Sequence, residues 1–422
     1  MVEALRHTKH WMICCQWDCF RFNKKMKENY RFLVFLGISV IVVALCFYSC
    51  GSSEVVTTEA VPEIVSEVVP ESAPEDIAEA VPEKQDYHLS ILIAGDFMQH
   101  GPQIKAALQP DSSYNYDECF ARVIPVIEDA DVAIGNLEVT LGGKPYAGYP
   151  QFRAPDEYLQ AIVDAGIDII LTANNHCLDS GKHGLERTIM MMDSVGVPHV
   201  GTYLDSMERA VNYPYIFEQN GIRVAVLNFT YGTNGLKVEK PNVVNMMDTL
   251  VIAGDLAKAQ SMNPDIIIAL PHWGIEYETL PSKEQRKMAN WLIDKGVDHV
   301  IGGHPHVAQP MELLNDGQNF VAYSLGNVIS NQSMPNTYGG YMVRLDFVKN
   351  DSLTMLSDCA YIPYWVSRPH DNDFKHNYRL LSLDEPDSLL TAKERQKRDT
   401  INEAMRTLFK NYNVGDIKEI GF

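Results

Sequence analysis

Basic side chains are scarce in this chain of 422 residues. Its 35 Lys and Arg residues face 55 Asp and Glu residues, which gives a formal net charge of −20. A surface that binds a phosphate backbone presents an excess of Lys and Arg. The composition therefore excludes a protein that binds nucleic acid non-specifically, and we expect no nucleic-acid partner.

Cysteine is scarce as well. Of eight cysteines, only Cys119, Cys177 and Cys359 lie beyond residue 50. Three thiols cannot form a disulfide framework, so the fold must be stabilised by a hydrophobic core. With 46% hydrophobic residues, the chain can bury a core sufficient for one large domain or two ordinary ones.

The first 50 residues have the character of a targeting segment. Residues 1–49 carry seven basic and three acidic side chains, and an uncharged apolar run occupies 32–48. A run of this length lies at the boundary between a secretory signal and a membrane-spanning helix. Cys50, followed by Gly-Ser-Ser, resembles the lipidated cysteine of a bacterial lipoprotein. We therefore expect a lipid anchor at Cys50 or an uncleaved signal anchor, with Met26 as the initiator and the remaining chain outside the cytoplasm.

Residues 51–87 form an acidic segment rich in Pro, Glu and Val. Val-Pro-Glu repeats begin at Val61, Val69 and Val81, and ten acidic side chains between 50 and 86 face a single lysine. Proline removes helix hydrogen-bond donors, and like charges four residues apart repel. We expect an extended, solvated linker that holds the folded body away from a membrane.

Beyond the linker, apolar runs of strand length alternate with segments of helical periodicity. Strands are expected at 89–94, 132–134, 167–172, 224–229, 266–270 and 300–301. Helices are expected at 118–129, 156–165, 184–195, 254–262 and 282–295. This alternation is typical of an α/β protein with parallel strands.

Later segments make the expected sheet mixed. A hairpin is predicted across 219–221, and the alternation at 341–347 favours an antiparallel strand with one face towards water. We expect one domain at 88–350, followed by a C-terminal extension at 351–422 that packs on it and ends in a helix at 392–411.

Polar side chains follow the apolar runs where each predicted strand ends. They are Asp96, Asn136, Glu138, Asn174, Asn175, His176, His272, His304 and His306. In open α/β sheets, ligands bind beyond the carboxyl ends of the strands, and oxygen and imidazole groups suit zinc, manganese or iron. Each motif alone has an ordinary structural interpretation, such as a turn at Asp96. His304 and His306 carry more information, because Pro305 favours extended backbone on which alternate residues face the same side. Together the motifs predict a metal site.

These motifs occur in a recognisable order over about residues 88–345. They are Gly95-Asp96, Asn136-Leu137-Glu138, Asn174-Asn175-His176 with Asp179 and Gly181, His272-Trp273-Gly274, Gly303-His304-Pro305-His306 and Tyr323-Ser324-Leu325-Gly326-Asn327. The series resembles the CapA-type family of poly-γ-glutamate capsule synthesis proteins, which is similar in fold to calcineurin-like metallophosphoesterases. The resemblance implies two mixed β-sheets, sandwiched together and flanked by helices. It also implies a membrane-attached protein of the bacterial cell envelope that acts with the machinery of capsule or exopolymer synthesis or export.

The resemblance implies roles for Asp96, Asn175, His176, His272, His304 and His306, and the residues around these motifs suggest further roles for Glu138, Asp179, Asn136, Asn174 and Arg153. One or two divalent ions, Mn, Zn, Fe or Mg, would be held by Asp96, Glu138, Asn175, His272, His304 and His306. His176 would be the general acid, with its ring oriented by Asp179. Substrate binding is assigned to Asn136, Asn174 and Arg153.

Two positions depart from the phosphoesterase pattern. Met98 stands where those enzymes have a histidine, and Asn136 stands where they have a metal-bridging aspartate. A neutral amide cannot offset the repulsion between two cations, and a thioether is a poor ligand for a hard ion. Glu138 can supply a carboxylate from the same face, so we expect one ion rather than two, and His100 is a weaker substitute for the missing imidazole.

Two functions remain open from the sequence. The first is a metal-dependent hydrolase or transferase that acts on a phosphoester or on an amide bond of an anionic polymer through a metal-activated water. The second is a non-catalytic polymer-binding or export component that retains the fold, which the incomplete ligand set motivates. A TIM barrel would also place ligands at strand ends, but the predicted hairpin and water-facing strand argue against eight uniform units.

Overall fold

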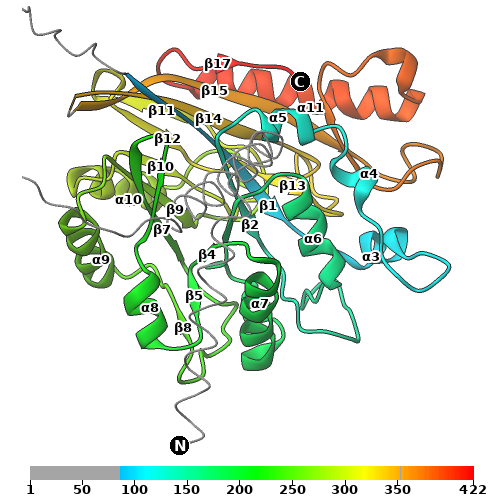
Figure 1. Ribbon diagram of the computed structural model, residues 1–422. Coiled ribbons are helices and arrows are strands. Elements are labelled where there is room, and N and C mark those ends of the chain that lie inside the picture. The colour runs from blue at the N-terminus through cyan, green and yellow to red at the C-terminus, as the bar shows by residue number, and fades with distance from the viewer. Residues whose placement is uncertain (1–85, 352) are drawn as a thin grey trace, which may run out of the picture. The chain divides into compact units, whose positions relative to one another are not determined.

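Two mixed β-sheets packed against each other form the centre of the body (Figure 1). The computed structural model describes residues 86–351 and 353–422. The expected signal or anchor at 1–50, and nearly all of the expected linker at 51–87, lie outside the described residues. Helices cover the sheets, so the predicted α/β fold with two mixed, flanked sheets is confirmed.

The larger sheet combines parallel and antiparallel pairs. Within the described residues its order is β16-β15-β14-β1-β2-β3-β4, with β13 beside the end of β1 and β17 beside β15. Strands β1 to β4 are parallel, whereas β14, β15 and β16 alternate in direction. The bounds are β1 (Tyr87–Phe97), β2 (Val132–Leu137), β3 (Ile169–Leu171), β4 (His199–Val200), β13 (Asn327–Ile329), β14 (Gly339–Asn350), β15 (Leu353–Ser367), β16 (Arg379–Ser382) and β17 (Lys418–Glu419).

The second sheet has the order β11-β12-β10-β9-β7-β6 in the described part of the chain. Its four inner strands are parallel, and each edge strand is antiparallel to its neighbour. The bounds are β6 (Tyr215–Gln219), β7 (Ile222–Thr230), β9 (Ile266–His272), β10 (His299–Ile301), β11 (Met311–Leu314) and β12 (Asn319–Ala322). A small separate ribbon pairs β5 (Thr202–Tyr203) with β8 (Val243–Val244).

Helices pack against both sheets. They are α3 (Gly101–Ala107), α4 (Asp117–Phe120), α5 (Ile124–Glu128), α6 (Asp156–Asp164), α7 (Gly181–Val195), α8 (Ser206–Asn212), α9 (Thr249–Ser261), α10 (Lys283–Asp294) and α11 (Ala392–Tyr412), with 3₁₀ turns at Asn315–Gly317 and Asp387–Leu389. Among the described residues, no helix is both long enough and apolar enough to cross a membrane.

Strand β1 shows how the apolar pattern builds two cores. Ile91 and Ile93 belong to the core shared with the second sheet, whereas Leu92 and Ala94 belong to the core beneath α4 to α7. Successive side chains of a strand point to opposite faces, so a continuous apolar run is what a strand buried on both faces requires. By this alternation alone Asp96 would share the face of Leu92 and Ala94. It faces the second sheet instead, because the register with β2 shifts between Ile93 and Asp96.

Local sequence signals explain most element boundaries. The predicted hairpin joins β6 to β7 through Asn220 and Gly221, whose φ angles are 51° and 74°, as a tight turn of this kind requires. Helix α7 ends before Gly196 in left-handed backbone at φ 69°. Helix α11 begins with a reciprocal capping box between Thr391 and Glu394.

Two predicted helix boundaries are wrong. The helix expected at 118–129 is two short helices, α4 and α5, because Pro125 has no N–H to continue a helix and stands instead in the first turn of α5. The helix expected to begin at residue 254 begins at Thr249, because the carboxylate of Asp248 accepts the N–H groups of Leu250 and Val251.

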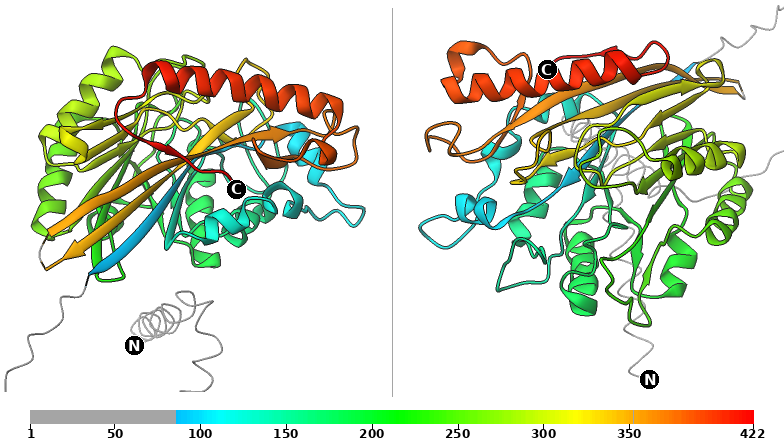
Figure 2. Two further views of the ribbon diagram at one scale, coloured as in Figure 1. Left: turned by 90° about the horizontal axis from the view of Figure 1, so that it is seen from above. Right: turned by 180° about the vertical axis from the view of Figure 1, so that it is seen from behind.

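The C-terminal segment is part of the larger sheet. The predicted boundary at residue 350 falls in the turn between β14 and β15, whose residues pair from Gly339 with Trp365 to Asn350 with Leu353. Helix α11 lies across these strands (Figure 2), and the ring of Phe409 packs against Tyr341. Strand β14 is antiparallel to its neighbours, as predicted, and its half-exposed residues are Arg344, Asp346 and those at 348–350.

A methyl group at residue 95 tests how closely the strands approach at the polar end of β1. The Cβ of Gly95→Ala would lie 2.0 Å from the carbonyl oxygen of Gly326, which accepts the N–H of Asp96. We expect a loss of about 1–3 kcal/mol in the free energy of unfolding, measured by urea titration. The control is Gly254→Ala in α9, where a Cβ meets nothing within 4 Å. We expect this substitution to raise the free energy of unfolding by at most about 1 kcal/mol. Equal effects of both substitutions would contradict the packing described.

A buried histidine in β10 predicts sensitivity to acid. Burial lowers the pKa of His299 to about 3 from its ordinary 6.5. Between these values the unfolded chain binds a proton that the folded chain does not, so stability falls as the pH drops below 6.5, by about 2–3 kcal/mol at pH 4.5. In His299→Asn the amide oxygen can still accept the N–H of Phe320. We expect this variant to lose the corresponding part of the difference between the free energies of unfolding at pH 7.5 and at pH 4.5. The same change at exposed His183 should leave the pH dependence as in the wild type.

Candidate metal centre

The carboxyl ends of parallel strands from both sheets meet along one rim. On the larger sheet, Asp96 of β1 is in register with Asn136 of β2 and with Asn327 of β13. On the second sheet, His272 ends β9 and forms a bridge with Gly303, which follows β10. Residues that the sequence placed at separate strand ends are therefore brought together.

Five side chains with ligand atoms gather at this rim in two overlapping groups. In one group the ligand atoms of Asp96, Glu138 and His272 lie within 4.8 Å of one another, and in the other those of Glu138, His304 and His306 do. All five side chains are buried, and Glu138 belongs to both groups. His272 Nε2 lies 3.4 Å from Glu138 Oε1, and His306 Nδ1 lies 3.6 Å from Asp96 Oδ2.

Three buried polar atoms of this cluster have no hydrogen-bond partner among the described residues. They are both carboxylate oxygens of Glu138 and Nδ1 of His304. Burying a polar group without a partner is unfavourable, and for a carboxylate strongly so. A divalent cation would satisfy carboxylate and imidazole together, and both are its ordinary ligands. The donor set therefore fits a divalent metal ion.

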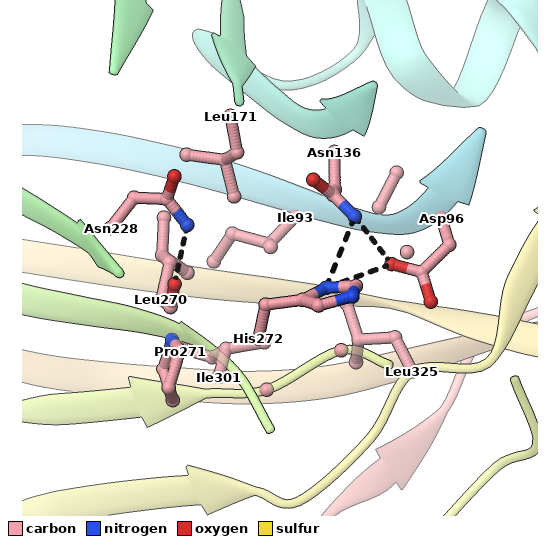
Figure 3. A pocket seen from close by; sticks show the side chains of 14 residues that line it. Ile93, Asp96, Asn136, Leu171, Asn228, Leu270, Pro271, His272, Ile301 and Leu325 are labelled. Atoms are coloured by element: carbon pink, nitrogen blue, oxygen red, sulfur yellow. Dashed lines mark hydrogen bonds and ion pairs between the residues drawn. The ribbon is translucent and has the colours of Figure 1, made fainter. Parts of the chain in front are cut away.

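Asp96 is held by hydrogen bonds to both carboxylate oxygens. Asn136 Nδ2 donates to Oδ1 at 2.7 Å, and the backbone N–H of His304 donates to Oδ2 at 3.1 Å. Burial raises the pKa of Asp96, but hydrogen bonding to His306 and the charges of His272 and His306 outweigh it and lower the pKa to about 2. Figure 3 shows Asp96, Asn136 and His272 around a small pocket between the sheets. Asp96 is therefore an ionised, oriented carboxylate at neutral pH.

The backbone around Pro305 is not extended, so this part of the sequence-based prediction is wrong. His304 has a φ of 101° and His306 a φ of 60°, in the left-handed region of backbone conformation that residues other than glycine rarely adopt. Both rings nevertheless reach Glu138. Their convergence rests on the fold of the loop, which Asp96 secures by accepting the N–H of His304, rather than on strand periodicity.

His176 and Asp179 form a hydrogen-bonded pair beside the cluster. His176 Nδ1 lies 2.7 Å from Asp179 Oδ2, which also accepts the N–H of Phe152, and the Phe152 ring packs on the imidazole. Burial lowers the pKa of His176, but the hydrogen bond to Asp179 and the charge of Glu138 outweigh it and raise the pKa above 6.5. With Nδ1 engaged by a carboxylate, the ring is oriented as the predicted general acid requires.

Asn175 touches the cluster through His272. Its Oδ1 lies 2.7 Å from His272 Nε2, and its Nδ2 donates to Oδ1 of Asn234 at 3.1 Å. Asn175 is therefore close enough to share a ligand role with His272. Its assignment as a metal ligand stays a prediction, because its oxygen is engaged by the histidine in this structure.

The residues assigned to substrate binding lie in different settings. Asn136 contacts Asp96, whereas Asn174 is fully buried and donates to Asn136 Oδ1 and to the carbonyl of Leu137. Arg153 donates to Ser180 Oγ at 2.9 Å and thereby fixes a loop at the edge of the rim. The contacts of Asn174 and Arg153 are those of scaffold residues, and their substrate role stays a prediction. The lipidation expected at Cys50 lies outside the described residues.

The two departures from the phosphoesterase pattern have structural counterparts. Met98 is buried in the core beneath the helices and contributes no ligand. His100 is in neither ligand group; its Nδ1 lies 3.2 Å from Gln103 Oε1 and 3.3 Å from the N–H of Asn331. The weaker expectation that His100 replaces the missing imidazole therefore receives no support from its contacts.

Sequence reasoning assigned no role to three residues of the site. Asn327 Oδ1 lies 3.0 Å from His306 Nδ1, Asn234 Nδ2 lies 3.4 Å from His176 Nδ1, and the Tyr231 ring lies 4.5 Å from that of His304. Asn327 ends the Tyr-Ser-Leu-Gly-Asn motif, which was a usable signal. Asn234 and Tyr231 follow β7 in a loop without a distinctive pattern.

A family model describes most of the body. The model of the bacterial capsule synthesis protein PGA_cap matches residues 90–332, more than half of the chain. The chain belongs to the PGA_cap family. The predicted family is thereby confirmed, and all five candidate metal ligands lie within the matched segment.

PGA_cap relatives include two proteins of Bacillus. The capsule biosynthesis protein CapA of Bacillus anthracis is 27% identical over 390 residues, which cover 89% of this chain and 87% of the relative. The PGA biosynthesis protein CapA of Bacillus subtilis (strain 168) is 26% identical over 275 residues, which cover 62% of this chain and 68% of the relative.

Solved structures similar to this PGA_cap chain include phosphoesterases. The calcineurin-like phosphoesterase YfkN from Bacillus subtilis has a TM-score of 0.40 at 15% identity, covering 78% of this chain and 99% of that chain. The putative 5′-nucleotidase from Staphylococcus aureus has a TM-score of 0.42 at 13% identity, covering 75% of this chain and 58% of that chain.

Metal analysis tests the cluster directly. We expect the purified protein, dialysed against Mn²⁺ or Zn²⁺ and then against buffer, to retain metal, and Glu138→Gln and His304→Ala to weaken the affinity by at least about tenfold. The melting temperature of the wild type should rise with added metal more than that of either variant. Glu394→Gln is a matched control, because Glu394 is equally buried but bonded to Arg379 and Ser367. Unchanged metal content in both cluster variants would show that the rim is not a metal site.

Proposed function

We propose that this PGA_cap protein is a metal-dependent hydrolase or transferase that acts on an anionic, glutamate-type polymer of the cell envelope. The observation that carries the proposal is the buried carboxylate of Glu138, which accepts no hydrogen bond from the described residues and lies within reach of three imidazoles. Beside it stands a hydrogen-bonded His176–Asp179 pair of the kind that transfers protons. The names of the Bacillus relatives supply the polymer and its capsule context.

The residues that would hold the metal are Asp96, Glu138, His272, His304 and His306, with Asn175 beside His272. A divalent ion in this position supplies Lewis acidity that polarises a carbonyl or phosphoryl oxygen and lowers the pKa of a water molecule. The protein fixes the donors beforehand: Asn136 and the His304 N–H orient Asp96, and Asn327 orients His306. Such support from neighbouring hydrogen bonds is what keeps ligands in a productive arrangement.

His176 is the residue that we propose protonates the leaving group. Its raised pKa means that a larger fraction of the imidazole carries a proton near neutral pH than in an ordinary histidine. After the proton is transferred, the neutral ring keeps its position through the hydrogen bond between Nδ1 and Asp179. Asp179 itself is fixed by the N–H of Phe152, so the pair is anchored to the loop that precedes α6.

Aromatic side chains around the rim suit a polymer that lies across it. The ring of Tyr231 packs against His304, and that of Tyr277 lies 6.2 Å from His306. Tyr149, 78% exposed, packs on Phe152 next to His176. Such rings offer apolar area and a hydroxyl to a passing chain. We propose that they form the walls of the substrate groove.

A non-catalytic polymer-binding or export component is the second candidate. Asn136 favours it, because its amide donates to Asp96 where phosphoesterases have a bridging carboxylate. The two candidates differ in one respect that can be measured: the hydrolase turns over a substrate, whereas the binding component only retains it.

We also propose that the body is attached to the outer face of the membrane. The support is the sequence of residues 1–87, with its apolar run, Cys50 and acidic linker. Such an arrangement suits a protein that works with envelope-bound capsule machinery and meets its polymer there. Radiolabelled palmitate incorporated into the wild type but not into Cys50→Ala would support the lipid form of this attachment.

Turnover by His176 variants tests the catalytic proposal. We expect metal-loaded wild type to cleave a γ-linked glutamate oligomer or a p-nitrophenyl phosphoester, and His176→Ala to lower kcat by about 10²–10⁴-fold while it still binds metal. Asp179→Asn should lower kcat less and shift its pH profile, because it leaves the imidazole in place but unsupported. His183→Ala, an exposed histidine of α7, is the control.

The same measurements separate the two candidates. Turnover by the wild type that falls in His176→Ala supports the enzyme. Sedimentation of the polymer with the wild type, with no cleavage of either substrate at any metal tested, would favour the binding component and overturn the catalytic role of His176.

A further inference from the structure

A buried arginine stands next to the metal cluster and has no carboxylate partner. Arg368 directly follows β15 and lies beyond the segment that the family model matches. Strands β1 and β15 both pair antiparallel with β14, through Ile93–Val343 and Val343–Tyr361, so they run in the same direction. The end of β15 therefore points to the rim at which β1 presents its polar end.

The guanidinium of Arg368 is only partly satisfied. The residue is 6% exposed, its Nε is buried without a hydrogen-bond partner, and its Nη2 donates to the carbonyl of Gln332. No Asp or Glu of the described residues lies within ion-pair distance of it. A buried cation is normally paired, because its desolvation is otherwise uncompensated. Among the described residues Nη1 makes no hydrogen bond or ion pair, so it is the atom left for a ligand.

Hydrogen bonds connect Arg368 to the metal cluster. Gln332, whose carbonyl accepts from Arg368, also accepts through Oε1 from Asn327 Nδ2 at 2.8 Å, and Asn327 Oδ1 lies 3.0 Å from His306 Nδ1. His100 Nδ1 lies 3.3 Å from the N–H of Asn331, the neighbour of Gln332; burial first, and then the charges of His306 and Arg368, lower the pKa of His100 to about 4. Arg368 is thus separated from a predicted metal ligand by two residues.

The surroundings of Arg368 carry a local excess of positive charge. Asp371 Oδ2 is engaged by Lys397 Nζ at 2.5 Å and by the backbone N–H of Arg368. Glu394 is engaged by Arg379 at 2.8 Å and by Ser367. Three cations therefore face two committed carboxylates, in a protein whose net charge is −20. This local excess is opposite in sign to the overall charge, and it adjoins the end of β15 that points to the rim.

We propose that Arg368 binds a carboxylate of the polymer, and so positions an acidic substrate against the metal cluster. The guanidinium fork matches a carboxylate in shape and charge, which an ammonium group does not. The identity of the substrate as an acidic polymer rests on the proposed function, whereas the anion site rests on the contacts of Arg368 alone. It gives the C-terminal segment, outside the matched family segment, a direct part in recognising the substrate.

Binding of a small dicarboxylate tests the anion site independently of turnover. The probe is glutarate, titrated by calorimetry into the metal-free full chain, so that no carboxylate can bind through metal. We expect Arg368→Gln to weaken glutarate binding by at least about tenfold, and Arg368→Lys to weaken it by a smaller factor. Neutral glutaramide should not bind. Arg344→Gln is the matched control, because Arg344 is in the same sheet and is already paired with Asp129 and Asp346.

The alternative outcomes are informative. Equal glutarate affinity in the wild type and Arg368→Gln, or no binding to the wild type, overturns the anion site. If Arg368→Gln does not fold, Arg368→Lys with wild-type affinity overturns it as well. Inorganic phosphate that binds more tightly than glutarate, and depends on Arg368, overturns the assignment to a carboxylate.

A γ-linked glutamate oligomer then separates this inference from the proposed function. With the metal-loaded protein we expect Arg368→Gln to raise KM by about tenfold and change kcat much less, because positioning is lost while the cluster remains. Cleavage with the same KM in the wild type and in Arg368→Gln would contradict the role of Arg368 but would still support the proposed hydrolase. Glutarate binding that depends on Arg368, without cleavage or binding of the oligomer, leaves the anion site standing and sinks the proposed substrate.

Discussion

The fully buried carboxylate of Glu138 is the constraint on which the site depends. It has no hydrogen bond, yet it lies within ligand distance of imidazoles from both β9 and the loop after β10. A charge in this position is tolerable only beside opposite charge. Burial lowers the pKa of His306, but the charges of Glu138 and Asp96 outweigh it and raise the pKa to about 9, so protonated His306 provides that charge when no metal is bound. The two sheets are therefore joined at their polar rim by electrostatics as well as by the apolar core between them.

Charge is distributed unevenly over this protein, and the region next to the rim differs in sign from the chain as a whole. The chain is strongly acidic overall, which disfavours contact with another polyanion. Next to the rim this sign is reversed locally, where Arg368 has no ion-pair partner among the described residues and Lys397 and Arg379 lie nearby. An acidic polymer would be repelled from most of the surface and attracted to one short stretch. The position at which the polymer binds can thus be determined by repulsion from the rest of the surface as much as by attraction at the site.

Much of the fold and the ligand set could be predicted from the sequence. Asp96, Glu138 and His272 follow apolar runs, and parallel strands place such ends at one rim whatever the details of the loops. The loop at His304 and His306 could not be predicted, because left-handed backbone at non-glycine residues depends on tertiary hydrogen bonds that leave no local pattern. Arg368 had no signal at all. It follows a strand like many arginines, and only the absence of a partner, which is a property of the folded chain, sets it apart.

The order in which the chain is synthesised has a consequence for how the domain folds. Strand β1, the first strand of the described residues, lies between β2 and β14, and Leu89 pairs with Phe347, roughly 250 residues later. Strand β15 and helix α11, which complete this half of the sheet, come later still. The larger sheet cannot close until nearly the whole chain is available, so it assembles after synthesis rather than during it. A protein cleaved near residue 350 would keep every predicted metal ligand and lose the strand that supports β14. The last 70 or so residues are therefore needed for the domain to fold, and a truncated chain would not form a stable site.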